Sequence, residues 1–399
     1  MMKRCNHIAQ RYATMTHSTS SVSDFGALPF DSQGMAADLR VWVEEESPTY
    51  DVTAVNKMMD LAARDMAIMG ASVQRVAGRL GYGDCIKASF PHALQGQPGI
   101  LVLGHLDTVH PVGTTGKFSW RQEGERCYGP GILDMKAGNY LSLEAIRQLQ
   151  RISFATPLPI TVLFTSDEEV GSPSSRALIE AEAARNRYVL VPEPARRNGG
   201  VVTGRYAIAR FKLTTRGRPS HAGLRLSEGA SAIREMAHQV IGIEGLTSDS
   251  TGYSVGVIRG GQWANCVSTS CEADVLVSAT TDEVLAEAIE VMLKLKPTTP
   301  GTQIEVQRDV TRPVWTRNDA SWALYEHASV LADSLGFDIP HQNSGGGSDG
   351  NFTGAMGIPT LDGLGARGDG PHTLDEHIVT ASLGERAALM AALFATLAP

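Results

Sequence analysis

The chain has 399 residues and a formal net charge of −8, with 35 lysines and arginines against 43 aspartates and glutamates. This length favours two domains, and the acidic balance excludes nucleic acid as the expected partner. Mean hydropathy is −0.10, and no apolar run approaches the roughly 18 residues of a membrane span, so we expect no membrane partner. The five cysteines are scattered without a CxxC pair, which is typical of free thiols in a reducing compartment and predicts a cytoplasmic protein.

The first 34 residues are polar and rich in serine, threonine and methionine, and they lack the apolar stretch of a signal peptide. We therefore expect a flexible N-terminal extension over residues 1–34, with Met15 as an alternative start of translation. The folded part of the chain is expected to begin at residue 35.

Buried strands alternate with helices through the next part of the chain. Apolar runs bounded by turn residues predict strands at 99–104, 158–165 and 188–191. Between the first two strands, apolar side chains recur every four positions from Leu141 to Leu149, as on one face of a helix. This alternation is typical of an α/β fold with a mostly parallel sheet covered by helices.

The pattern changes at Gly204. Six elements follow in the order β-α-β-β-α-β, which is typical of a compact ferredoxin-like α+β unit. We expect Thr280 and Glu283 to form a capping box at the start of its second helix. The elements are predicted at 207–215, 228–243, 253–258, 271–279, 285–293 and 303–310.

The chemical motifs resume after this unit. We therefore predict that residues 204–312 form a domain inserted into a first domain, which is made of residues 35–203 and 313–399.

Five groups of metal-ligand residue types lie at the ends of predicted strands or in glycine-rich loops. Each group alone is more typical of a cap or a turn than of a metal site. Together they would place several carboxylates at one edge of the sheet, and divalent cations would relieve the repulsion among them. A histidine two residues before an aspartate is also typical of a metal ligand whose second ring N–H is held by a carboxylate. The groups contain His105 with Asp107, Asp134, Asp167–Glu169, Glu193, and His372.

Six strings in order along the chain resemble the M20 family of zinc metallopeptidases, and within it the glutamate carboxypeptidase-like branch. They are HLDTV, GILDMKAG, TSDEEVGS, PEP, GRPSHAG and GPHTLDEH. The similarity runs from about Asp38 to the C-terminus and includes the ESPT segment at 46–49 and the loop at 345–350. It implies a zinc exopeptidase-like α/β domain, with a mixed sheet and helices on both faces. It also implies that the inserted domain is a lid that forms a homodimer.

The resemblance implies two divalent metal ions per subunit. His105, Asp134 and Glu193 would hold one ion, and Asp134 would bridge it to a second ion held by Glu169 and His372. Zinc is the expected metal, and the same ligands suit manganese and cobalt.

Further roles are implied by the same resemblance. Asp107 would orient His105, and Glu168 would be the general base. His221 would reach the active site of the partner subunit and stabilise the oxyanion, although a histidine in a Gly/Pro/Ser turn is also typical of a plain surface position. Arg312 would bind the substrate carboxylate, and Asn265 would touch the substrate. The glycines at 345–347, with Gly346 at their centre, could offer backbone N–H groups to the same carboxylate, although glycine loops are also commonly plain turns.

Departures from the family pattern affect the lid and the substrate pocket rather than the metal ligands. Relatives carry Arg-Lys-Gly where this chain has Arg205-Tyr206-Ala207, and Asn-x-Val-Pro where it has residues 265–268. The strand at Asp274 lacks the arginine of relatives, and no lysine follows Pro194. Hydrolysis is still expected, but a specificity for C-terminal glutamate is not.

We therefore predict a dinuclear-metal hydrolase that cleaves an amide or peptide C–N bond in a small carboxylate-bearing substrate. An N-acyl amino acid deacylase and an aromatic-amine aminohydrolase remain open, since Tyr206 and Trp263 offer stacking surfaces unless they pack inside the lid. A non-catalytic, metal-stabilised binding protein is an alternative of another class, in which Glu168 would have no use. A nucleic-acid-processing two-metal enzyme fits poorly with the net charge and with the lack of a basic stripe.

Overall fold

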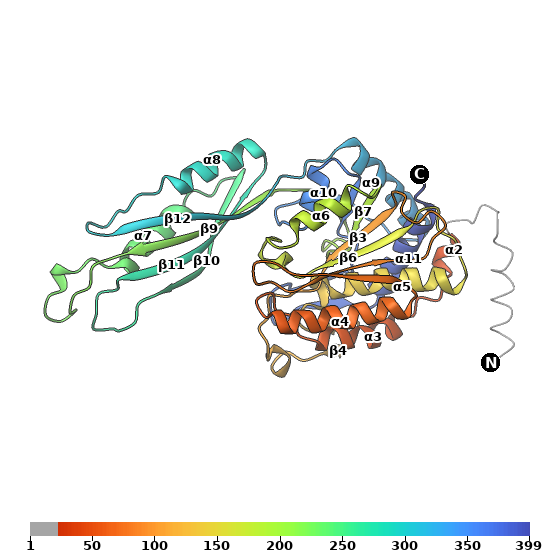
Figure 1. Cartoon of the computed structure of the whole chain (residues 1–399), viewed down its shortest axis with the longest axis horizontal. Coiled ribbons are helices and arrows are strands. Elements are labelled where there is room, and N and C mark those ends of the chain that lie inside the picture. Colours follow the sequence, from red (N-terminus) through yellow and green to blue (C-terminus); the bar gives the residue numbers. More distant parts are fainter. Residues whose placement is uncertain (1–22) are drawn as a thin grey trace. The chain divides into compact units, whose positions relative to one another are not determined.

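The computed structural model describes residues 23–399, which divide into two compact units (Figure 1). The predicted insertion at 204–312 falls inside unit 2, which also takes in residues 313–316 and a separate glycine-rich segment. Unit 1 comprises the chain up to Thr203, Arg317–Gln342 and Ser348–Pro399, and unit 2 comprises Gly204–Thr316 and Asn343–Gly347.

The main sheet has eight strands and is mixed, as predicted. Strands β6, β3, β7 and β14 at its centre run parallel, whereas β1 and β2 pair antiparallel to their neighbours and β8 pairs antiparallel to β14. The order across the sheet is β1 (Ser72–Val76), β2 (Cys85–Ser89), β6 (Ile160–Thr165), β3 (Ile100–His105), β7 (Tyr188–Val191), β14 (Thr360–Asp362), β8 (Val201–Arg205) and β13 (His341–Ser344).

Helices cover both faces of this sheet, which confirms the predicted fold class (Figure 1). Along β3, Ile100 and Val102 belong to the larger core with α3, α4, α5, α9 and α11, whereas Leu101 and Leu103 belong to a smaller core with α6 and α10. Because β3 is buried on both faces, its sequence is a continuous apolar run. The helices are α3 (Ser32–Glu44), α4 (Val52–Ile68), α5 (Ala137–Arg151), α6 (Arg176–Ala183), α9 (Asp319–Ser334), α10 (Gly350–Ala355) and α11 (Ala381–Thr396).

A second, smaller sheet in unit 1 lies next to the turn that carries Asp134. All of its strand pairs are antiparallel, and the order across it is β15 (Gly368–Asp369), β16 (His377–Val379), β5 (Arg126–Tyr128) and β4 (Arg121–Glu123).

The start of the described chain is folded. Residues Ser23–Gly26 form α2, and α3 begins at Ser32. Phe25 and Leu28 are buried, and the Phe25 ring meets the Phe154 ring edge-on at 5.7 Å between centroids. The expected flexible extension over 1–34 is therefore wrong for residues 23–34, because two apolar side chains within a polar segment reach the core. Residues 1–22, with Cys5 and Met15, lie outside the described part of the chain.

Unit 2 has the predicted ferredoxin-like plan. Its sheet is antiparallel throughout, in the order β10-β11-β9-β12, and alternate residues of β9 such as Phe211 and Leu213 pack against both helices. The N-cap of the second helix is Thr281, whose Oγ1 accepts a hydrogen bond from the Val284 amide, so the predicted cap at Thr280 is one residue early. The elements are β9 (Ala207–Arg216), α7 (Ala232–Glu244), β10 (Thr251–Gly260), β11 (Ser270–Ala279), α8 (Asp282–Leu293) and β12 (Gln303–Arg312).

Two further features concern the sequence predictions. Within residues 23–399, no helix combines the length and the apolar character that crossing a membrane requires. The cysteines of the same range are free thiols, namely Cys85, Cys127, Cys266 and Cys271.

Candidate metal centre

The five predicted metal ligands come from segments that follow strands or glycine turns of unit 1. His105 is the last residue of β3, and Glu193 lies two residues beyond β7. Asp134 lies in the irregular turn Ile132–Lys136, and Glu169 lies in the short 3-10 turn Glu168–Val170 after β6. His372 lies in the loop before β16. The carboxyl ends of parallel strands meet at one edge of a sheet, which explains how these distant residues come together.

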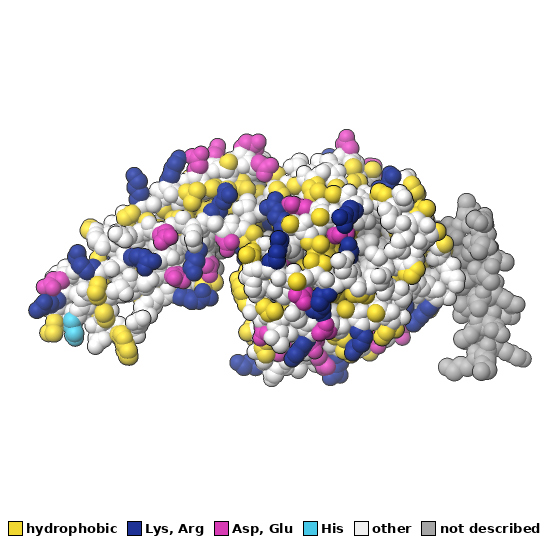
Figure 2. All heavy atoms as spheres, in the orientation of Figure 1, with side chains coloured by type: hydrophobic (Ala, Val, Ile, Leu, Met, Phe, Trp, Pro, Cys, Tyr) yellow, Lys and Arg dark blue, Asp and Glu magenta, His cyan; other side chains and the backbone are white. Residues whose placement is uncertain are grey.

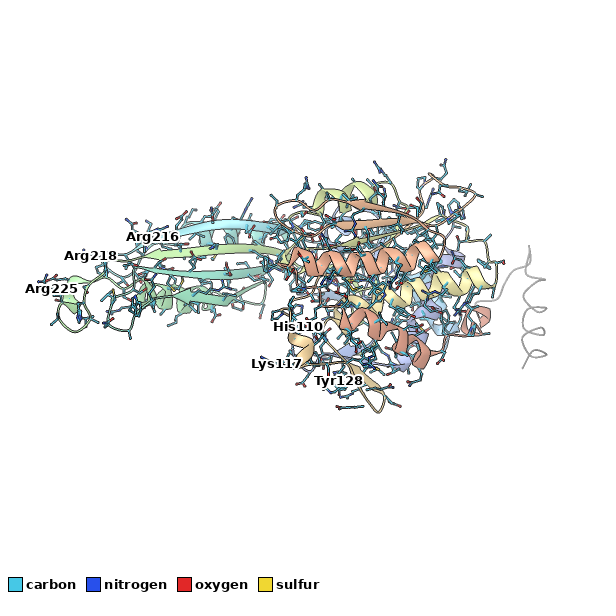
Figure 3. All side chains as sticks on the ribbon, turned by 60° about the horizontal axis from the view of Figure 1, so that its bottom comes forward. His110, Lys117, Tyr128, Arg216, Arg218 and Arg225 are labelled. Carbon is cyan, nitrogen blue, oxygen red and sulfur yellow. The ribbon has the colours of Figure 1, made fainter. Side chains whose placement is uncertain are left out.

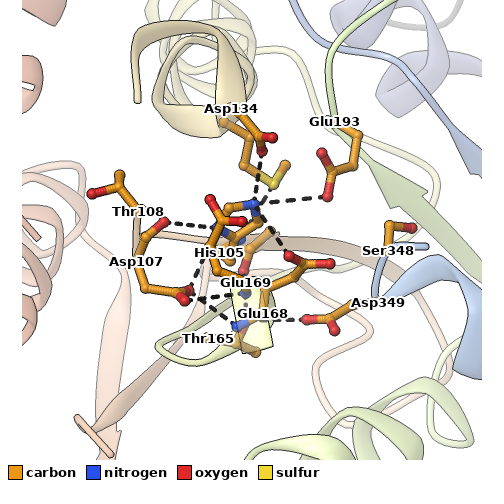
Figure 4. Close-up of polar contacts among 12 residues, drawn as sticks. His105, Asp107, Thr108, Asp134, Thr165, Glu168, Glu169, Glu193, Ser348 and Asp349 are labelled. Atoms are coloured by element: carbon orange, nitrogen blue, oxygen red, sulfur yellow. Dashed lines mark hydrogen bonds and ion pairs between the residues drawn. The ribbon is translucent and has the colours of Figure 1, made fainter. Parts of the chain in front are cut away.

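These side chains form two groups that share Asp134. In the first group, His105 Nε2 lies 3.1 Å from Asp134 Oδ1 and 3.8 Å from Glu193 Oε1 (Figure 4). In the second, His372 Nε2 lies 3.2 Å from both Asp134 Oδ2 and Glu169 Oε2. Within each group the potential ligand atoms all lie within 4.8 Å of one another. The two groups are the two ligand sets that the family resemblance implies.

Asp107 is fully buried and holds several parts of the centre. His105 Nδ1 lies 3.0 Å from the Asp107 backbone oxygen and 3.4 Å from Oδ1, so the backbone carbonyl is its nearer acceptor. The Asp107 carboxylate also accepts hydrogen bonds from the backbone amides of Glu168 (3.1 Å) and Glu169 (3.2 Å). A third donor is the Thr49 hydroxyl, at 2.7 Å. Asp107 therefore positions the turn after β6 as well as the imidazole (Figure 4).

Glu168 lies beside the first group without belonging to either ligand group. Its side chain is largely buried, and Oε2 lies 3.9 Å from His105 Nε2. A carboxylate held near the ligands but outside their set has the position of a proton acceptor.

The electrostatics of the centre indicate a shortage of positive charge. Burial, followed by the negative charge of Asp134, raises the pKa of Glu193, and the same two causes raise the pKa of Glu169 to about 8. Hydrogen bonds to Asp134 and Glu169 raise the pKa of His372 to about 11. The crowded carboxylates thus favour a proton on His372, and divalent cations would supply that positive charge instead. Three carboxylates and two imidazoles fit such ions chemically.

Two residues that support the centre, Thr49 and Asp349, were not predicted from the sequence. Thr49 belongs to the ESPT segment, but nothing in that string identifies its hydroxyl as the partner of Asp107. The buried Asp349 accepts hydrogen bonds from Thr165 Oγ1 (3.1 Å) and from Ser172 Oγ, on either side of the turn that carries Glu168. These contacts join segments that are far apart in the chain, so no local pattern reveals them.

His221 and Asn265 lie in neighbouring exposed loops of unit 2. The Ala222 amide donates to the Asn265 carbonyl at 2.9 Å, and His221 forms a β-bridge with Cys266. The turn after His221 continues to Arg225, labelled in Figure 3. Figure 2 shows a histidine and several hydrophobic side chains exposed at one end of unit 2. Leu224, Leu226 and Trp263, which are exposed, belong to the loops of His221 and Asn265.

Arg312 and the glycine loop 345–347 come together in unit 2. Arg312 is buried, and a Cβ on Gly347 would lie only 3.0 Å from its Cδ atom, so any larger residue there would press against the arginine side chain. Arg205 was missed as part of this arrangement. Its guanidinium donates to the carbonyls of Gly346 (2.9 Å) and Gly347 (3.3 Å). The predicted metal ligands thus all belong to unit 1, whereas the predicted substrate contacts all belong to unit 2.

Comparison with known proteins gives a family match over most of the chain. Residues 101–396 match the model of peptidase family M20/M25/M40. Carboxypeptidase G2 of Pseudomonas sp. (strain RS-16) is 27% identical over 376 residues, which cover 92% of this chain and 90% of that protein. Acetylornithine deacetylase of Myxococcus xanthus is 28% identical over 190 residues, or 44% of this chain and 48% of that protein.

Solved structures share the fold at low sequence identity. Human carnosine dipeptidase 1 has a TM-score of 0.74 at 15% identity, and the match covers 93% of this chain and 98% of that one. The M20 family metallo-carboxypeptidase Sso-CP2 of Sulfolobus solfataricus has a TM-score of 0.72 at 13% identity, with 91% and 99% of the chains covered.

Proposed function

The chain belongs to the M20/M25/M40 family of peptidases and is a hydrolytic enzyme, and on that premise we propose that it cleaves an amide or peptide C–N bond in a small carboxylate-bearing substrate. The observation that carries the proposal is the sharing of Asp134 by two convergent ligand groups. A carboxylate shared in this way suits a pair of metal ions that act on one water molecule.

The proposed centre holds two divalent metal ions, with zinc as the first choice and manganese or cobalt as alternatives. M20 peptidases are metal-dependent, and the donor set of this chain fits such ions. One ion would be held by His105, Asp134 and Glu193, and the other by Asp134, Glu169 and His372. When bound, the pair would lower the pKa of a water molecule and polarise the carbonyl of the substrate.

Glu168 is the proposed general base. It takes the proton of the attacking water at its carboxylate and delivers it to the leaving nitrogen. Its backbone amide donates to Asp107, which fixes the main chain of the turn at this residue. The position of its carboxylate near His105, at 3.9 Å, supports this role. It also disfavours a non-catalytic metal-stabilised protein, which has no use for a largely buried acid outside the ligand set.

Unit 2 is proposed to recognise the substrate. Arg312, buried against the glycine loop, would bind the substrate carboxylate through its planar guanidinium, with Asn265 and Gly346 as further contacts. We also propose that His221 stabilises the negative charge that develops on the carbonyl oxygen, and that it does so in the partner subunit of a homodimer. The exposed position of His221 on its loop is compatible with a role outside its own unit.

The proposal also names candidate classes of substrate. Among the relatives, the name of carboxypeptidase G2 indicates a peptide-type substrate. The name of acetylornithine deacetylase indicates an N-acyl-type substrate. The ring of Tyr206 lies next to Gly345, where a Cβ would be 3.7 Å from Cδ2, so an aromatic surface borders the proposed carboxylate site. This contact supports N-acyl amino acids and aromatic amines as the second candidate class beside dipeptides.

The test combines metal analysis with a substrate screen. The metal-loaded protein is assayed against dipeptides, N-acyl amino acids and aminobenzoate derivatives. Glu168→Ala is expected to abolish turnover while retaining about two ions per subunit, since it removes only the base. Glu169→Ala, its neighbour in the same turn, is expected to lose both turnover and one ion. Full turnover by Glu168→Ala would sink the proposal.

A further inference from the structure

Glu376 is a buried carboxylate to which the proposed reaction gives no role. It is 1% exposed and lies directly before β16, four residues after His372. Its Oε1 accepts hydrogen bonds from the amides of Leu133 (2.8 Å) and Asp134 (3.0 Å), and its Oε2 accepts one from Gly131 (2.9 Å). Hydrogen bonds from backbone amides to a carboxylate are stronger than those between neutral groups. A buried acid with three such donors has a specific structural task.

The turn that Glu376 binds does not hold itself together as a helix does. Gly131 has a left-handed backbone (φ 68°), and Asp134 has φ −111° and ψ 94°, outside the helical region. Two backbone bonds span the turn, from the Lys136 amide to the Gly131 carbonyl (3.1 Å) and from the Ala137 amide to the Ile132 carbonyl, and neither involves the amides that Glu376 binds. Convergent amides of this kind form an anion-binding concavity, and here a side chain of the same protein fills it.

This turn carries the carboxylate that joins the two ligand groups. Asp134 reaches His105 with Oδ1 and His372 with Oδ2, so its position matters to both groups. Glu376 is attached to the loop of His372 by sequence and to the turn of Asp134 by hydrogen bonds. It therefore ties together the main chains of two ligands of the same group.

A contact with the loop after β3 completes the arrangement. His110, labelled in Figure 3, lies five residues beyond His105 and is buried. Its Nε2 lies 3.3 Å from Glu376 Oε2. One carboxylate thus contacts or belongs to the segments that carry His105, Asp134 and His372, although it is not a member of either ligand group.

We propose that Glu376 is a positioning residue that sets the divalent-metal affinity of the centre by holding the main chain of Asp134. The proposal rests on the proposed function, because it assumes that Asp134 is the bridging ligand. A purely structural role predicts a loss of stability alone. A positioning role predicts in addition a loss of metal affinity in the folded protein.

The experiment compares Glu376→Gln with a matched variant of unit 2. The glutamine keeps the size of the side chain but replaces one acceptor oxygen by an NH₂ group that faces a backbone N–H. We expect the Kd for Zn²⁺, measured by competition with a chromogenic chelator, to rise about 10–100-fold. Hydrogen exchange in the metal-free protein should become faster at the amides of Gly131, Leu133 and Asp134.

The matched control is Glu235→Gln. Glu235 is also fully buried and accepts hydrogen bonds from the backbone amides of Thr298 and Thr299, but it lies in unit 2. This variant should lose stability and keep the wild-type Kd for Zn²⁺.

Three results overturn the proposal. They are an unchanged Kd in folded Glu376→Gln, an equal rise in Kd in Glu235→Gln, and unchanged exchange at the three amides. If Glu376→Gln does not fold, Glu376→Asp takes its place, with a shorter reach to the same amides and the same expected direction. A wild-type chain that binds no divalent ion overturns the proposed function itself, which separates that failure from a failure of the role of Glu376.

Discussion

Glu169 in unit 1 and Glu235 in unit 2 are glutamates with largely buried side chains, yet their pKa values move in opposite directions. Burial and the negative charge of Asp134 raise the pKa of Glu169 to about 8, against the opposing effect of His372. Burial alone would also raise the pKa of Glu235, but hydrogen bonds from Gln239 and from the backbone at residues 298–299 outweigh it and lower the pKa to about 2.

The difference lies in what surrounds each carboxylate. The charge of Glu235 is satisfied inside the protein by five hydrogen-bond donors on unit 2. Glu169 is paired with His372, at 3.2 Å, but it also lies in the negative field of Asp134. Perturbed pKa values cluster at functional sites, which supports the proposed role of this edge of the sheet in unit 1.

The largest effect is expected from replacing Asp134, the residue that both ligand groups share. Asp134→Asn removes one ligand from both groups and the charge that raises the pKa of Glu169. We expect turnover to fall on the order of 10³-fold or more, about 4 kcal/mol in transition-state stabilisation, with loss of both metal ions by elemental analysis. Asp375→Asn, an exposed acid in the same loop as His372, is the control and should keep both. Wild-type metal content in Asp134→Asn would contradict the bridging role.

A smaller effect, on the pH dependence of stability, is expected from Glu235 in unit 2. Because the folded-state pKa of Glu235 is lowered, its contribution to stability is fully present above its unfolded pKa of about 4.5 and is lost as the pH falls towards 2. The shift from about 4.5 to about 2 corresponds to about 3 kcal/mol. Chemical denaturation of unit 2, followed between pH 6 and pH 2 in the wild type and in Glu235→Gln, measures it. The two curves should converge at low pH, and parallel curves would show that Glu235 contributes no pH dependence.

The smallest effect tests the helix cap in unit 2. Thr281→Ala removes the side chain that accepts from the Val284 amide and should cost about 1 kcal/mol of unfolding free energy. Thr280→Ala is the matched control, because Thr280 precedes the cap observed in the structure. Thermal unfolding of both variants decides between the two threonines. A larger loss in Thr280→Ala would restore the capping box expected from the sequence.

Local patterns predicted the elements that position the site. The apolar runs identified β3, β6 and β7 to within two residues, because strands buried on both faces need continuous apolar sequence. The six elements of unit 2 were also predicted in order, although the first helix begins at Ala232 instead of residue 228, after Ser231 as N-cap. Ends of elements depend on caps, and several serines and threonines near an end are equivalent in sequence.

Non-local contacts account for what the patterns missed. Residues 343–347 belong to unit 2 although they are distant in sequence from its main segment, since Arg205 binds the carbonyls of Gly346 and Gly347. Phe25 and Leu28 reach the core from a segment whose composition is that of an extension. In both cases the partner lies far along the chain, where no periodicity indicates it.

The sequence by itself determined the fold class, because buried strands and amphipathic helices leave periodic apolar patterns. The two proposed ligand sets and the neighbouring acid Glu168 followed from ordered motifs that resemble those of the M20 family. Only the tertiary structure decided how these groups are held. Asp107 and Glu376 each bind the backbone of a turn that carries a ligand, Glu169 and Asp134 respectively. A carboxylate can accept from any amide that folding brings near it, so the identity of that amide is a property of the folded chain and not of any local string.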